Sequence, residues 1–138
     1  MKHIFLLVAC TVLVSSASAE VITIFDANDT ITSADTYDTV VVKGDGTVVN
    51  MTGGSITKLI VMDSATVNIS DGTVSSCYAY DASNLYVSGG NHNEAWTYQN
   101  NTTTITGIAS YSYMEISGNS EVTMSSNSAS FSGGANIW

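Results

Sequence analysis

Proline and arginine are both absent from this chain of 138 residues, which contains three lysines and twelve acidic residues. The formal net charge is therefore −9 at pH 7. Nucleic acids and anionic lipid surfaces are bound through clusters of Lys and Arg, and phosphates or sugar carboxylates commonly through Arg. We therefore expect no nucleic-acid partner and no site built for anionic ligands.

A long hydrophobic run is also lacking. The apolar stretch from Ile4 to Val14 is too short for a membrane-spanning helix, which needs about 20 residues. Lys2 precedes this stretch and small residues ending in Ala17-Ser18-Ala19 follow it, an arrangement typical of a secretory signal peptide. We expect residues 1–19 to be a signal peptide, so that the protein is secreted or lies at the cell surface without a membrane span.

Cysteine is scarce, with two residues in the chain. Leu7-Val8-Ala9-Cys10 resembles a bacterial lipobox, which makes lipoprotein anchoring at Cys10 an alternative to ordinary cleavage. The short apolar stretch before Cys10 favours ordinary cleavage. Cleavage after Ala19 leaves Cys77 alone, so no disulfide forms within the mature chain, and we expect the Cys77 thiol to be buried.

What the mature chain does have is a period of 18 residues. Turns that start at Val49, Val67 and Leu85 align, and they share a column of aspartates and a column of glycines: Asp45, Asp63 and Asp81, and Gly54, Gly72 and Gly90. The density of Gly, Asn and β-branched residues argues against helix. A single turn buries almost no apolar surface, so the turns must stack on one another, about 4.8 Å apart.

The sequence therefore predicts an all-β, single-domain parallel β-solenoid of about five to six roughly 18-residue turns. Residues 40–138 would form the repeats, after an N-terminal strand or cap at residues 20–39. The glycine column is expected to turn a corner with positive φ, and the aspartate column to form tight turns. An insertion near residues 100–103 is expected to break the register.

The repeats resemble those of bacterial secreted and surface-exposed β-helix proteins of the autotransporter-adhesin kind. The resemblance covers about Val40 to Val87 and is clearest in residues 67–90, VNISDGTVSSCYAYDASNLYVSGG. It implies a parallel β-helix. It brings no catalytic residues that could be assigned to this chain.

The second strand of each repeat has small residues at one parity and large ones at the other. A narrow interior suits the smaller set, which includes Cys77, so the larger set is expected to line the outside as a flat stripe. We call it the aromatic stripe: Ile60, Met62, Tyr78, Tyr80, Trp96 and Tyr98. Such a row stabilises the stack by ring–ring contact, or it binds a glycan, another protein or a second copy of the chain.

The aspartate column offers a weaker candidate site. Asp45, Asp63 and Asp81 on stacked turns would lie about 4.8 Å apart. Carboxylate oxygens suit Ca²⁺, but turn formation by Asp explains the same pattern and is favoured. No metal and no cofactor are therefore predicted.

Two further readings stay open. A polysaccharide-degrading β-helix would need two carboxyl groups at a defined separation in a cleft, and the only histidine of the repeats, His92, stands where Ile56 and Val74 stand in neighbouring turns. An ice-binding solenoid is a more remote alternative, suggested by rows of Asn, Ser and Thr outside the first strand. We expect a non-enzymatic exported solenoid that acts as a structural, adhesive or surface-contact module.

Overall fold

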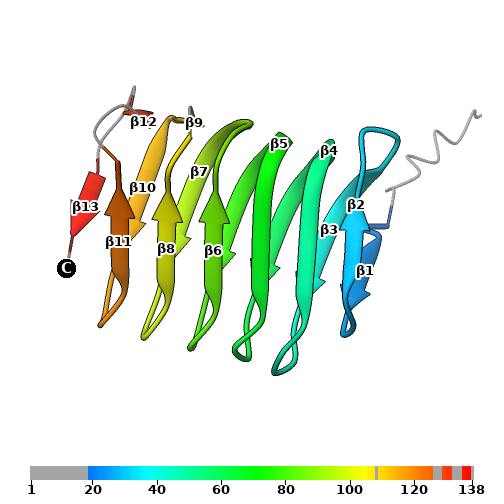
Figure 1. Ribbon diagram of the computed structural model, residues 1–138, viewed down its shortest axis with the longest axis horizontal. Coiled ribbons are helices and arrows are strands. Elements are labelled where there is room, and N and C mark those ends of the chain that lie inside the picture. The colour runs from blue at the N-terminus through cyan, green and yellow to red at the C-terminus, as the bar shows by residue number, and fades with distance from the viewer. Residues whose placement is uncertain (1–18, 108, 126–128, 132–134, 138) are drawn as a thin grey trace, which may run out of the picture.

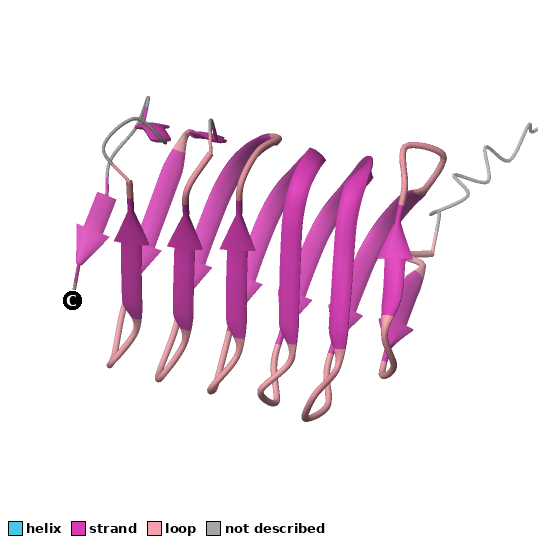
Figure 2. Cartoon of the chain, in the orientation of Figure 1, coloured by secondary structure: helices cyan, strands magenta, loops and turns pink. Residues whose placement is uncertain are grey.

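The computed structural model describes residues 19–107, 109–125, 129–131 and 135–137, and all regular structure in this part of the chain is β-strand (Figure 2). In chain order the strands are β1 (Ile22–Phe25), β2 (Asp29–Ile31), β3 (Thr36–Val42), β4 (Val48–Val61), β5 (Thr66–Ala79), β6 (Asn84–Val87), β7 (Asn91–Thr97), β8 (Thr102–Ile105), β9 (Ala109–Tyr111), β10 (Tyr113–Ile116), β11 (Glu121–Met124), β12 (Ala129–Phe131) and β13 (Ala135–Ile137).

The strands wind into a flattened coil with two long sides (Figure 1). The first sheet contains β2, β6, β8, β11 and the first halves of β4 and β5, and the second contains β1, β3, β7, β10, β13 and the second halves of β4 and β5. The described pairings are parallel, and Val49, Val67 and Leu85 are partners in successive coils. The predicted parallel β-solenoid is confirmed, with about six turns.

The expected register break near residues 100–103 is wrong. Leu85 pairs with Thr103, so the first sheet keeps the 18-residue period through this segment. The extra residue enters at the next corner, because Asn91 pairs with Ser110, 19 positions along the chain. The β10 strand pairs with β7 at the same spacing of 19 residues, and β13 pairs with β10 at a spacing of 21 residues.

A pair of buried polar side chains explains why the register holds. The Asn101 amide is buried and donates hydrogen bonds to the carbonyl oxygen of Ser83 at 2.9 Å and to its hydroxyl at 3.0 Å. The Thr103 hydroxyl, also buried, donates to the Asn101 side-chain oxygen at 2.8 Å. These polar groups satisfy one another inside the coil, so they replace the apolar residues of the earlier turns at low cost.

The core is a set of side-chain columns between the two sheets. The columns repeat β-branched and other aliphatic residues from coil to coil, as with Val49 and Val67, or Met51 and Ile69, all at most 1% exposed. Cys77 lies in this core, as predicted, and burial raises the pKa of its thiol to about 12.

The corners and turns follow the two predicted columns. Gly54, Gly72 and Gly90 all have positive φ, as expected for the corner between the sheets. At the opposite end of the cross-section, Asp63 and Asp81 adopt left-handed φ values of 55° and 56°, a conformation that Asp tolerates better than most residues.

The N-terminal segment continues the stack. The β1 strand pairs with β3, and Phe25 packs edge-on against Tyr37 with ring centroids 6.0 Å apart, while Ile22 and Ile24 stay more than half exposed. The predicted signal peptide, apart from Ala19, and the Cys10 lipidation site lie outside the described residues. Within the described part, the structure has no helix with the length and apolar character needed to span a membrane.

Candidate functional site

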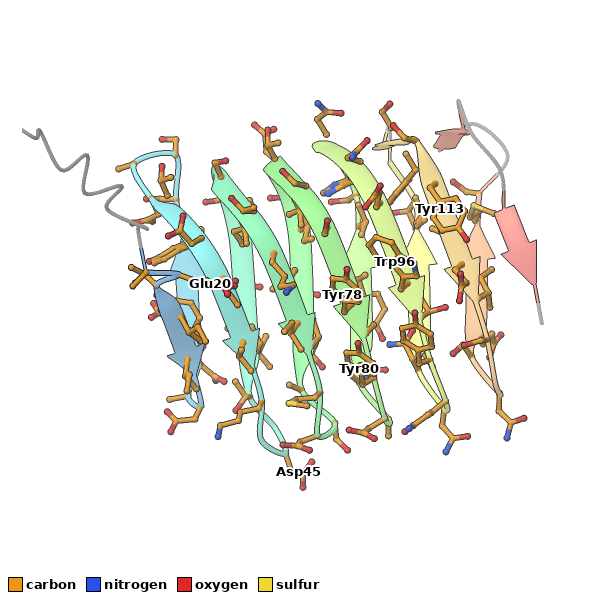
Figure 3. The ribbon with its side chains drawn as sticks, turned by 180° about the vertical axis from the view of Figure 1, so that it is seen from behind. Glu20, Asp45, Tyr78, Tyr80, Trp96 and Tyr113 are labelled. Atoms are coloured by element: carbon orange, nitrogen blue, oxygen red, sulfur yellow. The ribbon has the colours of Figure 1, made fainter. Side chains whose placement is uncertain are left out.

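The aromatic stripe lies on the outer face of the second sheet. Ile60 pairs with Tyr78 and Tyr78 with Trp96 on consecutive coils. The predicted parity is confirmed: all six stripe residues are half-buried, while the alternate positions are buried, namely Leu59, Val61, Cys77, Ala79, Ala95 and Thr97. Figure 3 shows Tyr78, Tyr80 and Trp96 on this face.

The rings of the stripe stand on edge rather than lying flat. Tyr78 and Trp96 have ring centroids 4.5 Å apart and planes only 4° from parallel. Coplanar rings at that separation would overlap, so the two rings stack face to face along the solenoid axis. Tyr80 and Tyr98 repeat the arrangement at 5.2 Å and 14°. The expected flat stripe is therefore corrected: the outer surface presents ring edges, because parallel coils bring like residues one strand spacing apart.

Both faces of Tyr78 are covered. Trp96 stacks on one side, and the Lys58 ammonium lies 6.0 Å from the ring centroid, at the limit of a cation–π contact. Beyond Trp96, the Tyr113 ring lies 6.0 Å away at a tilt of 54°, and its hydroxyl donates to Glu115 at 2.8 Å. The stack thus runs from Lys58 to Tyr113.

The apolar surface is longer than the sequence indicated. In the row of Ile60, Tyr78 and Trp96, the register adds Val41 and Ile24 at the N-terminal side. In the neighbouring row, Tyr113 pairs with Glu94. The sequence pattern did not identify Tyr113, because the extra residue at the preceding corner lengthens the period to 19. It did not identify Ile24, because the first coil matches the repeat poorly.

Two phenol groups of the stripe, those of Tyr80 and Tyr98, have a raised pKa. Burial raises the pKa of Tyr80 above its ordinary value, and burial together with the nearby Glu115 carboxylate raises that of Tyr98. These hydroxyls therefore act as uncharged donors and acceptors over the ordinary pH range.

The aspartate column is part of the turns before each first-sheet strand. Asp63 and Asp81 each follow the first residue of a turn closed by a backbone hydrogen bond, from Ala65 to Met62 and from Ser83 to Tyr80, and Asp45 holds the same place in the preceding turn. In the described part of the chain, no three His, Cys, Asp or Glu side chains gather in a way that could hold a metal ion. The turn role accounts for the column.

His92 faces the interior of the coil, in the column of Ile56 and Val74 as the alignment predicted. Its Nε2 donates to the Gly89 carbonyl oxygen at 3.0 Å, and its ring stacks on Tyr111 at 5.3 Å. Burial lowers the pKa of His92, so the imidazole is neutral near pH 7. This histidine packs the core and lies away from the aromatic stripe.

The polar side chains in the rows of the first sheet form hydrogen bonds between neighbouring coils. Asn68 donates to the side-chain oxygen of Asn50 at 2.9 Å. The Ser70 and Ser88 hydroxyls donate to carbonyl oxygens of the preceding coil at 3.2 and 3.3 Å. Half-exposed Tyr86 interrupts the rows of Asn, Ser and Thr.

A shallow groove of about 430 Å³ lies beside the stripe at Lys58, between residues 19–20 and neighbouring coils of the second sheet. Six of its seven lining residues have polar side chains; the seven are Ala19, Glu20, Asp38, Thr39, Thr57, Lys58 and Ser76. The Thr39 hydroxyl donates to the Glu20 carboxylate, which closes one side of the groove.

Comparison of the chain with protein-family models, with curated proteins and with solved structures gave no significant match.

Proposed function

We propose that this protein is an exported, non-enzymatic solenoid that acts as a structural, adhesive or surface-contact module, with the aromatic stripe as its contact surface. The observation that carries the proposal is the row of Ile60, Tyr78 and Trp96, which repeats an outward apolar side chain on consecutive coils. Soluble proteins seldom expose a contiguous apolar row unless it is a contact surface. The rigid sheet beneath holds the row in one geometry.

The chemistry of the remaining polar groups supports a contact role over catalysis. An acid–base mechanism needs side chains that converge on one reacting atom. Here His92 points into the core, and Asp63 and Asp81 occupy turns at the end of the cross-section opposite the glycine corner. Glu20 and Asp38 both line the groove beside Lys58. Both are exposed to solvent, so they are not carboxyl groups enclosed in a cleft.

The ring geometry favours a protein partner over a sugar. Sugar rings stack on exposed aromatic faces, and in the pair Tyr78 and Trp96 those faces are turned toward each other. Ring edges and phenol hydroxyls pack well against protein side chains, where Tyr and Trp are enriched at interfaces.

The test is to replace Tyr78, Tyr80, Trp96 and Tyr98 together by Ser and to measure self-association, adhesion to surfaces and glycan binding. Tyr86→Ser on the first sheet is the matched control, because it removes an exposed ring from the opposite face. Circular dichroism establishes that both variants keep their strand content. We expect the quadruple variant to lose the contact behaviour of the parent protein; a folded quadruple variant with every contact unchanged would contradict the proposal.

A further inference from the structure

We propose that the partner of the aromatic stripe is a second copy of this chain, packed face to face about a two-fold axis that runs along the second half of β5. This inference rests on the stripe being a contact surface, as proposed above. Its evidence is the placement of charge on either side of Tyr78.

Two opposite charges flank the centre of the stripe symmetrically. Ser76 pairs with Lys58 on one neighbouring coil and with Glu94 on the other. Lys58 and Glu94 are thus one coil before and one coil after Ser76, in the same row of the sheet, and both are partly exposed.

A two-fold axis parallel to the strand through Ser76 and Tyr78 exchanges these two neighbouring coils. Lys58 of one copy then faces Glu94 of the other, and the same pair forms a second time by symmetry, as in any isologous interface. Complementary charges placed in this way fix the orientation of two partners.

The same operation matches apolar groups to apolar groups. Tyr78 meets its own symmetry mate, Ile60 lies opposite Trp96, and Met62 lies opposite Tyr98. The match is confined to the three central coils, because two coils away from β5 the operation places Val41 opposite Glu115.

The alternative in-plane axis lacks this complementarity. An axis along the solenoid would place each coil opposite itself, and the second half of β4 that carries Lys58 (residues 55–61) contains no acidic residue. The charges therefore select the axis along the strand.

The size of the surface predicts a weak dimer. Five coils about 4.8 Å apart, with strands of about five residues at about 3.3 Å each, make a flat patch of about 400 Å². Each partner in a standard stable interface buries about 800 Å². The complex should therefore be measured at high micromolar protein concentration.

The test is sedimentation equilibrium of the purified protein and of four charge variants. We expect a dimer in the parent protein, dissociation constants at least about tenfold higher for Lys58→Glu and for Glu94→Lys, and recovery of the parent value in the doubly reversed protein. Glu121→Lys on the first sheet makes the same charge change as Glu94→Lys and should leave the constant unchanged.

Several outcomes would overturn the inference: a parent protein that stays monomeric at high micromolar concentration, single reversals without effect, or a folded double reversal that fails to recover. If either reversal prevents folding, Lys58→Gln and Glu94→Gln replace them, each with an expected weakening. If the parent protein is monomeric and the Tyr and Trp replacements still abolish its adhesion, the dimer proposal is wrong, whereas the proposal of the aromatic stripe as a contact surface is supported.

Discussion

Tyr78 and Trp96 lie on neighbouring coils with their rings stacked at a centroid distance of 4.5 Å and an angle of 4°. The two residues are 18 positions apart in sequence and are direct partners in the parallel pairing of β5 and β7. Their contact is thus a property of the solenoid period, and it ties the stability of the stack to the same side chains that form the proposed contact surface.

Removal of this stacked pair should destabilise the protein. A double-mutant cycle of Tyr78→Ala and Trp96→Ala is expected to give a coupling energy of about 1 kcal/mol in the free energy of unfolding, the range measured for stacked aromatic pairs. Urea unfolding measures it. Tyr86→Ala with Trp96→Ala is the control cycle, since these rings lie on opposite sheets, and its coupling should be near zero.

The buried Cys77 thiol should be inert in the folded protein. Its pKa is raised to about 12, so almost none of it is thiolate at pH 8, and burial blocks access by reagents. A thiol-reactive dye should label the protein only after unfolding. Rapid labelling of native protein would place this strand in a different register.

The same thiol predicts a loss of stability at alkaline pH. Between the ordinary thiol pKa of 9.0 and the folded value of about 12, the unfolded chain has lost its proton while the folded chain keeps it. The free energy of unfolding therefore falls as pH rises through this window. Cys77→Ala should remove that part of the alkaline slope, measured by unfolding at several pH values, and an identical slope in both proteins would refute the assignment.

Gly72 at the corner is required for two reasons, its backbone conformation and the lack of space for a side chain, and a comparison with Gly46, in the Asp45 turn, separates them. Gly72 has φ +108°, and a Cβ there would meet Met51 Cε at 2.5 Å and the Gly53 carbonyl at 2.9 Å. Gly46 has φ +76° with open space around it. Gly46→Ala should cost about 1 kcal/mol for backbone strain alone, and Gly72→Ala should cost about 2 kcal/mol more because the adjacent coil must move. Equal losses in thermal unfolding would contradict the close approach of the coils.

The buried polar pair of Asn101 and Thr103 at the start of β8 should be as important as an apolar contact. Asn101→Ala leaves the buried Thr103 hydroxyl without its acceptor and the Ser83 hydroxyl without its donor, which costs about 2 kcal/mol, while the Ser83 carbonyl keeps its hydrogen bond from the Thr102 N–H. Asn100, its exposed neighbour, is the control: Asn100→Ala should change the free energy of unfolding by less than about 0.5 kcal/mol. Chemical denaturation of the two variants compares them.

Much of the fold could be predicted because the 18-residue repeat that orders it is visible in the sequence. The spacing of Val49, Val67 and Leu85 gives the length of one coil directly. Side-chain size was enough to place Cys77 inside the coil and Tyr78 outside it. The continuity through Thr103 could not be predicted, because a buried threonine is compatible with the core only through the hydrogen bonds that Asn101 makes.

The ring geometry and the full extent of the aromatic stripe could not be predicted from the sequence, for a different reason. The row could be identified from sequence, but the orientation of Tyr78 against Trp96 depends on side-chain torsions and on the spacing between coils. The addition of Tyr113 depends on one extra residue at a corner. Both are decided by packing between coils rather than by the pattern within one repeat.

The most direct test of the stripe as a contact surface is the solvent accessibility of Trp96, read from acrylamide quenching of fluorescence in a Trp138→Phe variant that leaves Trp96 as the only tryptophan. We predict that the quenching constant falls as the protein is concentrated into its associated form and stays high when Tyr78, Tyr80 and Tyr98 are replaced by Ser. Association of the protein with Trp96 equally accessible at every concentration would show that the contact lies elsewhere.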